Sequence, residues 1–303
     1  MAKKISYRLE QLKDRVPRRP EAFSFEFFPP KNPEMEQQLK ASISELAKLH
    51  PSLMTVTYGA GGSTRQRTAE IAAYIQETTG IGAAAHITSV NATKAVIQDV
   101  LTDYEHKHIR HVVALRGDMP GFDGQYRPLA EGYAYAKDLV EAIAARGTFE
   151  ISVAGYPETH PQALSEQDDL YRLKEKIDAG ATRIITQYCY DTDVMLRYIE
   201  KVRKIGITVP VVPGIMLIAH FKQMCKFSGQ CGASVPAWMH QLCDGIDDDP
   251  QLRLPVAVAI AAEQCRLLMQ EGVSQFHFYS LNRHEAAKAV CQLLGGGVSQ
   301  HHD

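Results

Sequence analysis

The segment FSFEFFPPKNPE, residues 23–34, gives the first indication of the fold. Side chains alternate between the two faces of a strand, so Phe23, Phe25 and Phe27 share one face while Ser24 and Glu26 share the other. The three phenylalanines predict a strand with one face packed in a hydrophobic layer. Glu26 points away from that layer, and what lies on its side decides whether it is a surface residue or a working acid.

The end of the same segment argues against a nucleotide-binding doubly wound sheet. Such a sheet usually carries a glycine fingerprint directly after its first strand. Here the strand ends in prolines, and the nearest glycine-rich stretch, GAGG at 59–62, follows the next apolar run. That stretch could bind a phosphate at the start of the helix behind it, although a plain tight turn explains it equally well.

Apolar runs of period 2 alternate with stretches of helical period along the rest of the chain. The predicted strands are residues 23–28, 53–58, 83–88, 111–116, 150–156, 183–188, 208–215 and 275–281. The predicted helices are residues 34–49, 64–79, 92–106, 134–146, 165–179, 191–205 and 284–294, with a longer helical region at 220–271. Eight strand and helix units are the number found in a closed barrel, so we predict an α/β protein with the (β/α)8 TIM-barrel fold.

Length and composition are consistent with a single barrel domain over residues 21–303. The chain has 303 residues, of which 45% are hydrophobic and 22% are charged, and barrels of this kind commonly contain about 250 residues. Residues 1–20 are locally basic and are predicted to form a solvated helix or arm, which could pack on a neighbouring subunit.

Charge and cysteine usage narrow the classes of partner. The net charge of -2 and the pI of 6.6 give no bias toward nucleic acid or anionic membranes. No stretch reaches the ~18 apolar residues that a membrane span needs, and no signal peptide is evident. The six cysteines form no CxxC pair and there is no HExxH motif, so we expect neither a disulfide framework nor a metal site. His106, His108 and His111 are expected at the surface, and a reduced cytoplasm is the expected setting.

Polar side chains gather where the predicted strands end, which is where barrels of this class build their sites. These residues are Glu26, Thr57, Tyr58, His86, Thr88, Arg116, Asp118, Tyr156, Glu158, His160, Gln187, Tyr279 and Arg283. Alternation predicts that three further strand faces line the lumen together with Glu26. These faces hold Thr55 and Thr57; Ala84, His86 and Thr88; and Val112, Ala114, Arg116 and Asp118. Ionised groups in such a place are costly unless they are paired or used, so a functional site competes here with a satisfied polar network.

The type of chemistry is constrained by what is missing. No serine lies in a GxSxG elbow, and no cysteine stands beside a histidine in a recognisable pattern. Lys174 and Lys176 lie on a predicted helix, where exposed lysine is the ordinary case, so a Schiff-base aldolase has little support. A cavity rich in hydrogen-bonding groups and aromatics suits a large planar cofactor, which would then supply the difficult chemistry.

Ten motifs in order carry a specific resemblance that runs from about residue 21 to residue 293. They are FSFEFFPP, VTYGAGG, AHIT, VALRGD, SVAGYPETHP, ITQYCYD, PGIM, FKQMCKF, VPAW and FHFYSLNR. With these motifs the chain resembles the 5,10-methylenetetrahydrofolate reductases of the short, bacterial, single-domain type. The resemblance implies a flavoprotein barrel that oxidises NADH or NADPH, carries the hydride on FAD, and reduces methylenetetrahydrofolate to 5-methyltetrahydrofolate for methionine synthesis.

The resemblance also implies roles for individual residues. Glu26 would be the general acid that protonates the departing folate nitrogen, and shielding from water could keep its carboxyl group protonated near neutral pH. Asp118 would place a negative charge beside the flavin and promote hydride release. The FAD-binding positions would be Thr57, Tyr58, Ala60, His86, Arg116, Gly117, Asp118, Tyr135, Ala136, Tyr156, His160, Ala163, Asp169 and Lys176. The folate-binding positions would be Gln187, Gln223, Phe227 and Arg283, with Phe227 able to stack on either the pterin or the nicotinamide.

The chain departs from the familiar bacterial pattern at Arg172 and Glu175, so the phosphate contacts near Lys176 are expected to be rearranged. Two other classes stay open from the residues themselves: a cofactor-free barrel lyase that uses Glu26 and Asp118 as acid and base, and a non-catalytic folate-binding protein. The choice between NADH and NADPH also stays open, because no Rossmann acidic residue is available to indicate it. Members of the family usually form dimers or tetramers, so a homo-oligomer is expected.

Overall fold

The structure is a computed structural model that describes residues 19–59, 64–117 and 128–296. The expected basic arm at residues 1–20 therefore lies almost entirely outside the described residues, as do Ala60 and Asp118. Within the described part of the chain, no helix is long and apolar enough to cross a membrane.

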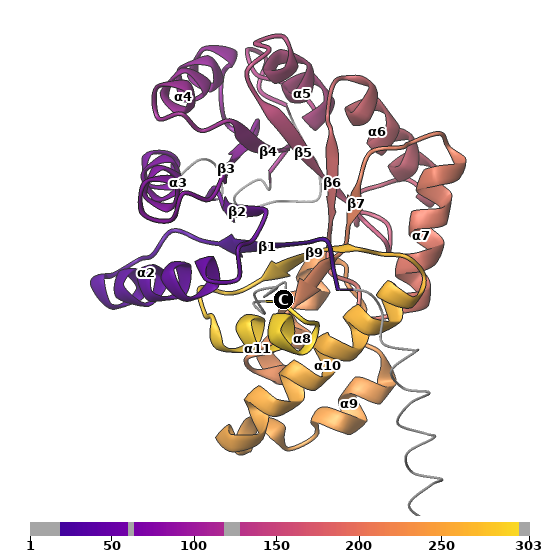
Figure 1. The fold of residues 1–303 in the computed structure, drawn as a ribbon. Coiled ribbons are helices and arrows are strands. Elements are labelled where there is room, and N and C mark those ends of the chain that lie inside the picture. The colour runs from indigo at the N-terminus through magenta and orange to yellow at the C-terminus, as the bar shows by residue number, and fades with distance from the viewer. Residues whose placement is uncertain (1–18, 60–63, 118–127, 297–303) are drawn as a thin grey trace, which may run out of the picture.

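Parallel strands form one sheet that curves into a barrel, with helices around its outer surface (Figure 1). The sheet order is β7-β6-β5-β4-β3-β2-β1-β9-β8, and every neighbouring pair is parallel. The strands are β1 Ala22–Phe27, β2 Leu53–Val56, β3 Ala83–Thr88, β4 His111–Leu115, β5 Glu150–Gly155, β6 Arg183–Thr186, β7 Val211–Val212, β8 Gly214–Met216 and β9 Gln275–Tyr279. The predicted (β/α)8 barrel is confirmed.

The seventh predicted strand, 208–215, is split into β7 and β8. Proline can accept but not donate in a sheet, and Pro213 lies between the two short strands. The carbonyl of Pro210 accepts from Ile184 of β6 at 2.9 Å, whereas the carbonyl of Pro213 accepts from His277 of β9 at 2.9 Å. The same segment thus pairs with both ends of the sheet and closes the barrel.

The helices alternate with the strands largely as predicted. They are α2 Pro33–Ala47, α3 Arg65–Thr79, α4 Lys94–His106, α5 Ala136–Ala144, α6 Glu166–Asp178, α7 Thr192–Lys204 and α11 Glu285–Leu293. The helical region 220–271 consists of α8 Phe221–Cys231, α9 Ala237–Cys243, the 3-10 turn η2 Ile246–Asp248 and α10 Pro250–Gln270. Local signals set the ends: Asn32 caps α2 by accepting from the amide of Met35, and Gly80 ends α3 with a left-handed φ of 70°.

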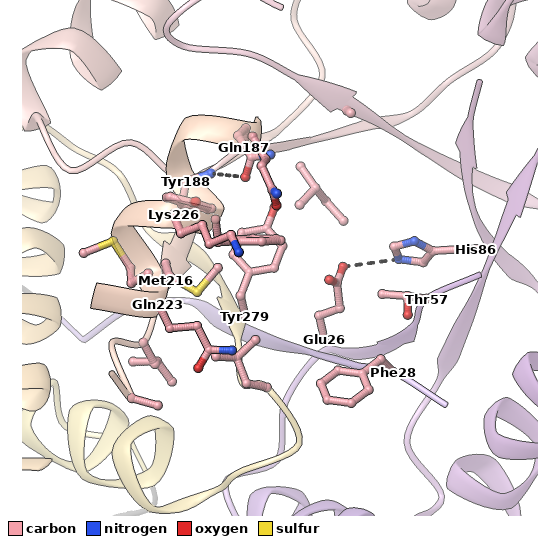
Figure 2. Close-up of a pocket in the computed structure, with 18 of the residues that line it drawn as sticks. Glu26, Phe28, Thr57, His86, Gln187, Tyr188, Met216, Gln223, Lys226 and Tyr279 are labelled. Atoms are coloured by element: carbon pink, nitrogen blue, oxygen red, sulfur yellow. Dashed lines mark hydrogen bonds and ion pairs between the residues drawn. The ribbon is translucent and has the colours of Figure 1, made fainter. Parts of the chain in front are cut away.

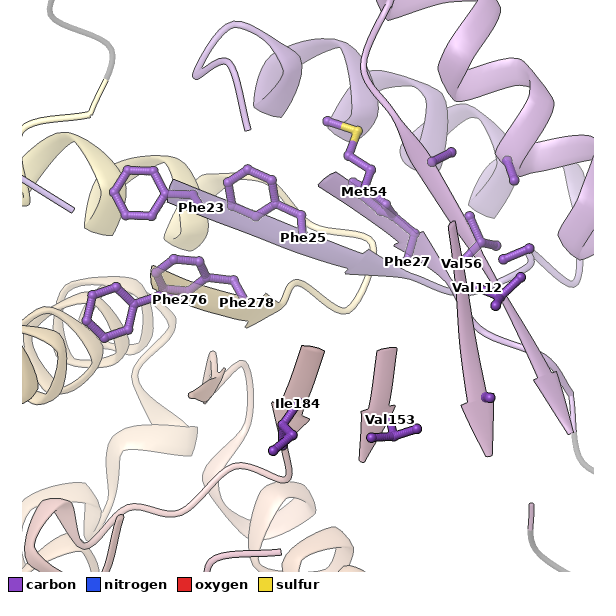
Figure 3. Close-up of a cluster of buried hydrophobic side chains, with 14 of the residues drawn as sticks. Phe23, Phe25, Phe27, Met54, Val56, Val112, Val153, Ile184, Phe276 and Phe278 are labelled. Atoms are coloured by element: carbon purple, nitrogen blue, oxygen red, sulfur yellow. The ribbon is translucent and has the colours of Figure 1, made fainter. Parts of the chain in front are cut away.

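The main hydrophobic core lies between the sheet and its helices. Phe23, Phe25 and Phe27 are all buried, and the rings of Phe23 and Phe25 each lie 5.9 Å from the ring of Phe278 (Figure 3). Leu39 of α2 belongs to the same cluster. The phenylalanine face of β1 is therefore the outer face of the barrel, which leaves Glu26 on the lumen side.

The strand registers show which residues line the lumen. Glu26 pairs with Thr55, and His86 pairs with Val113. The predicted lumen faces of β2 and β3 are thus confirmed, but the prediction for β4 is wrong by one residue. Val112 and Ala114 pack in the outer core, while Val113 and Leu115 point inward. Arg116 follows the last paired residue of β4, so strand alternation does not determine its direction.

Candidate active site

A cavity of about 960 Å³ opens at the carboxyl ends of the barrel strands. Figure 2 shows side chains from opposite sides of the barrel converging on it. Strands, and the residues directly after them, contribute Glu26, Phe28, Thr57, His86, Tyr156, Gln187 and Tyr279 to its lining. Helix α8 contributes Gln223, Lys226, Phe227 and Gln230. The volume is at the upper end of the range for small-molecule and cofactor sites.

Glu26 lies at the centre of a group of buried polar side chains in the barrel wall. Its Oε2 is 3.4 Å from His86 Nε2 and 3.6 Å from His277 Nε2. The Glu26 side chain is 20% exposed, against 8% for His86 and 0% for His277. The carboxylate therefore faces the cavity from a wall whose other titratable members are closed to solvent.

The end of β1 is fixed by residues that follow β9. The Ser280 hydroxyl donates to the carbonyl of Glu26 at 2.6 Å. The side-chain amide of Asn282 binds both backbone groups of Phe28, accepting from its N–H at 2.9 Å and donating to its carbonyl at 2.8 Å. These bonds hold the backbone directly after the Glu26 side chain, so the carboxyl group projects from a fixed position.

The surroundings of Glu26 favour its charged form, whereas the sequence led us to expect a neutral acid. Burial raises the pKa of Glu26, but His277, His86 and the Thr55 hydroxyl together lower it by more. The pKa of Glu26 therefore lies below the usual glutamate value. The pKa of His86 is lowered, mainly by burial and in part by His277, although Glu26 opposes this. The histidines and the hydroxyl thus favour the charged form of the Glu26 carboxyl group.

A second group of predicted residues surrounds the end of β5 and the start of α6. Lys176 Nζ donates to the carbonyl of Ala154 at 2.7 Å, and burial lowers its pKa to about 8, against the opposing charge of Asp169. Asp169 accepts from the amide of His160 at 3.0 Å, and the His160 ring lies edge-on to Tyr156 at 4.6 Å. Lys176 is therefore not the exposed helical lysine that its sequence context suggested.

The remaining predicted cofactor residues lie around this group with different degrees of exposure. Tyr58 is buried, Tyr135 is 52% exposed at the start of α5, and Ala136 and Ala163 are partly buried. Arg116 donates to Gln162 at 2.5 Å. Gly117 has a φ of 86°, and a Cβ atom there would lie 2.8 Å from Thr88 Cβ, so only glycine fits.

The departure at Arg172 and Glu175 has a structural counterpart on the exposed face of α6. Arg172 pairs with Glu175 at 3.1 Å and with Asp168 at 3.5 Å. Its guanidinium also lies 5.8 Å from the centre of the Tyr135 ring. The positive charge of this helix surface is therefore tied to neighbouring acids and to an aromatic ring.

The predicted folate residues divide into two groups. Gln187, Gln223 and Phe227 line the cavity, and Phe227 lies parallel to Tyr188 with ring centres 6.4 Å apart. Arg283 is exposed beyond the end of β9 and does not line the cavity. Arg283 thus follows the lining residue Leu281 by two positions but lies outside the lining itself.

Several residues in and around the cavity were not found from the sequence. Lys31, His220 and Lys226 place basic side chains around the mouth, and Asp247 accepts from the amides of Phe221 and Lys222 at 2.7 and 2.8 Å. Asp247 thereby caps α8 from η2, since His220 at the helix start makes no side-chain cap. His277 was also missed, although its alternation with the buried Phe276 and Phe278 points it into the lumen.

Histidines, cysteines and acidic residues within the described ranges form neither a candidate metal site nor a disulfide. No group of three or more histidine, cysteine or acidic residues there could hold a metal ion. All six cysteines are free thiols.

Sequence comparison gives consistent matches over nearly the whole chain. The family model described as methylenetetrahydrofolate reductase matches residues 11–295. Proteins named 5,10-methylenetetrahydrofolate reductase from Pectobacterium carotovorum and Escherichia coli K12 are each 45% identical over 272 residues, covering 90% of this chain and 89% and 90% of theirs. A rice protein named probable methylenetetrahydrofolate reductase (NADH) is 37% identical, and the match covers 90% of this chain but 48% of the rice protein.

Solved structures share the fold at low sequence identity. A Clostridium thermocellum protein described as binding two copies of 5-methyl-5,6,7,8-tetrahydrofolic acid has a TM-score of 0.62 and 14% identity, covering 94% of this chain and 96% of that one. An oxaloacetate acetylhydrolase has a TM-score of 0.51 and 10% identity, covering 92% and 81%. These similarities support the barrel, while the sequence matches identify its family. The chain belongs to the methylenetetrahydrofolate reductase family of oxidoreductases.

Proposed function

We propose that the protein is a flavoenzyme that uses NADH or NADPH to reduce 5,10-methylenetetrahydrofolate to 5-methyltetrahydrofolate, with FAD carrying the hydride. The observation that carries the proposal is a single carboxylate, Glu26, facing a cavity of about 960 Å³ from a wall of buried histidines. One-carbon folate metabolism follows from family membership, and supply of methyl groups for methionine synthesis is part of the proposal.

The residues present are suited to a large cofactor beside the folate. Lys176 keeps a buried ammonium at the end of β5, where its cost would be offset by a phosphate or an electron-rich ring oxygen. The Thr88 hydroxyl is buried without a hydrogen-bond partner among the described residues, at the end of β3, which β4 separates from β5. Thr57, His86 and Tyr156 line the cavity between these points and Glu26, so we assign this side to FAD.

FAD, when bound, would accept a hydride from the reduced nicotinamide and supply it to the folate. The chain itself would supply the proton. Opening the five-membered ring of the substrate needs a proton on the departing folate nitrogen, and Glu26 is the acid that the cavity presents. Substrate that covers the remaining 20% of exposed surface of Glu26 would remove water from the carboxylate and raise its pKa toward the acid form.

The side of the cavity formed by α8 would hold the folate. Gln187 and Gln223 present amides that can pair with the donor and acceptor edge of a pterin, and Phe227 offers a ring for stacking. Arg283 and Lys226 lie where the glutamate tail would leave the cavity. We also expect the protein to form a dimer or tetramer. Asp118, which lies outside the described residues, is expected to place a negative charge beside the flavin.

The test is an anaerobic titration of the purified protein. A yellow protein whose flavin absorbance is bleached by NADH or NADPH, and restored by methylenetetrahydrofolate with formation of 5-methyltetrahydrofolate, would support the proposal. A colourless protein that cannot be reconstituted with FAD would overturn it and favour a cofactor-free lyase or a binding protein.

A further inference from the structure

His277 is a buried titratable group that general-acid catalysis by Glu26 does not by itself require. Its ring is fully buried, and its two nitrogens face different partners. Nδ1 lies 2.8 Å from the Ser24 hydroxyl, and Nε2 lies 3.6 Å from Glu26 Oε2. The three side chains form a line along the lumen because Ser24 and Glu26 share the lumen face of β1, and Ser24 pairs in register with His277 on β9.

Ser24 joins this line to the opposite end of the barrel. It lines a small cavity of about 10 Å³ together with Ser52, Arg183 and Gln275. Ser52 is exposed, and Arg183 and Gln275 are partly exposed, so the cavity lies next to the surface at the amino-terminal ends of the strands. Its size is about the minimum that one water molecule needs.

The charges around His277 favour passing a proton toward Glu26. Glu26 from β1 is the anionic group that faces the ring, while His86 from β3 approaches the same Oε2 atom of that carboxylate. Tyr279 is edge-on at 5.3 Å on the same strand, and β8 offers the uncharged Gly214 and Met216. Arg183 of β6 lines the cavity beyond Ser24, so its positive charge disfavours storage of a proton at that end.

The proposed reaction creates a need for such a path. Reduction of a methylene bridge to a methyl group by a reduced nicotinamide consumes one proton per turnover, and the proposed acid gives that proton away. The carboxylate form of Glu26 is favoured in the ligand-free site, because the neighbouring histidines and the Thr55 hydroxyl hold its pKa below the usual value. Cofactor and substrate would also cover the mouth of the main cavity while the proton is needed.

We propose that Ser24 and His277 form a proton relay that reprotonates Glu26 from the amino-terminal end of the barrel. In this step the His277 Nε2–H bond breaks and an O–H bond forms on Glu26. The Ser24 hydroxyl gives its proton to Nδ1, and Ser24 regains a proton from water entering the small cavity. The hydroxide left there is neutralised by a proton from bulk solvent, so the relay takes up one solvent proton per turnover. The ring ends neutral in its other tautomer and no electrons are exchanged. The 3.6 Å separation is long for a hydrogen bond, as catalytic contacts often are before substrate binds.

The relay rests on the proposed function, and Ser24→Ala tests it without touching the cavity that would hold the substrate. The rate of flavin reoxidation by methylenetetrahydrofolate is measured by anaerobic stopped flow between pH 6 and pH 8. We expect the wild-type rate to change little over this range. The Ser24→Ala rate should fall about tenfold per pH unit, because protonation of Glu26 then depends on free protons. Flavin reduction by the nicotinamide should match the wild type at every pH.

The matched control is Ser152→Ala, which removes another buried hydroxyl from the lumen, on β5, away from Glu26. It should keep the wild-type pH profile. His277→Gln keeps hydrogen-bonding groups but cannot relay a proton, so it should reproduce the Ser24→Ala pH profile. This second variant tests the relay if Ser24→Ala does not fold.

Two results would overturn the relay: a pH profile in either relay variant that superimposes on the wild type, or an equal loss in both half-reactions. These failures are distinct from failure of the proposed function. If wild-type protein bleaches with nicotinamide and Glu26→Gln blocks only the folate half, the function stands whatever Ser24→Ala shows.

Discussion

The two sides of the main cavity are held in different ways. On one side, β1, β3 and β9 present Glu26, His86 and His277, whose side chains are 20%, 8% and 0% exposed. On the other side, α8 presents Gln223, Lys226 and Phe227, all of them exposed, with Phe227 at 46%. The strand wall is fixed by sheet hydrogen bonds and burial, whereas α8 is held by one buried face and by Asp247.

This difference separates chemistry from recognition. A buried wall can set charge states, because neighbouring groups interact strongly where water is excluded. An exposed helix can contact substrate but cannot control its protonation to the same degree. Substitutions in the wall should therefore reduce the rate of the folate step, and substitutions around α8 should mainly weaken substrate binding.

The largest effect is expected from Glu26→Gln in the strand wall. The variant keeps the shape of the side chain and loses its transferable proton, so turnover with methylenetetrahydrofolate should fall by about 100- to 10,000-fold. Turnover with menadione as electron acceptor should be preserved, because that reaction needs no proton on a folate nitrogen. Loss of flavin or of thermal stability in this variant would instead indicate a structural role.

A smaller effect is expected from Arg283→Ala at the mouth. Loss of one charge-assisted hydrogen bond to the glutamate tail costs about 1.5–3 kcal/mol, so the folate KM should rise by about 10- to 150-fold. Flavin content should not change. Arg266→Ala is a matched control, since Arg266 pairs with Glu263 on the outer helix α10. A folate KM that stays at the wild-type value would remove Arg283 from the site.

The support of α8 is tested by Asp247→Ala. Removal of a helix cap costs about 0.5–2 kcal/mol, so the folate KM should rise by about 2- to 30-fold. The maximal rate of the folate step should change less than the KM. Asp248→Ala, the neighbouring acid of η2, is the control and should behave like the wild type. An effect on the maximal rate alone would contradict the division between the two sides.

The smallest effect concerns Lys176, which extends the buried wall toward the proposed cofactor. Its folded pKa of about 8 lies below its normal value of 10.5, so the unfolded chain binds more protons between these values. Stability of the flavin-free protein should thus rise with pH across this window, and below it the cost of the buried charge is fully present. Lys176→Met should flatten this rise and increase the flavin-free Tm at neutral pH by a few degrees, while weakening FAD binding measured by flavin fluorescence. An unchanged FAD affinity would remove Lys176 from the cofactor site.

Sequence reasoning predicted the barrel because its signals are local. Alternation placed the phenylalanines of β1 on the outer face and Glu26 on the inner one, and glycine and capping residues marked helix ends such as Gly80 and Asn32. The β4 prediction failed since alternation was continued through Arg116 and Asp118, beyond Leu115 where the ladder ends. The break at Pro213 was missed because the segment stays paired on both sides of it: the carbonyl of Pro210 accepts from β6, and that of Pro213 accepts from β9.

The site was only partly predictable because its key contacts join distant residues. Ser24 and His277 are 253 positions apart, and Asp247 caps a helix that begins 26 positions earlier. The lowered pKa of Glu26 depends on two histidines from other strands, so the sequence around Glu26 could not show that the ligand-free form is charged. The partly buried position of Lys176 likewise depends on its contact with β5 and not on its helical context.

The most direct test of the central claim measures the two half-reactions of Glu26→Gln separately. The flavin-loaded variant is mixed anaerobically with NADH to follow flavin reduction, and photoreduced variant is mixed with methylenetetrahydrofolate to follow reoxidation. If Glu26 supplies only the proton for ring opening, reduction should proceed at the wild-type rate while reoxidation slows by at least about 100-fold. Equal slowing of both half-reactions, or reoxidation at the wild-type rate, would contradict this role.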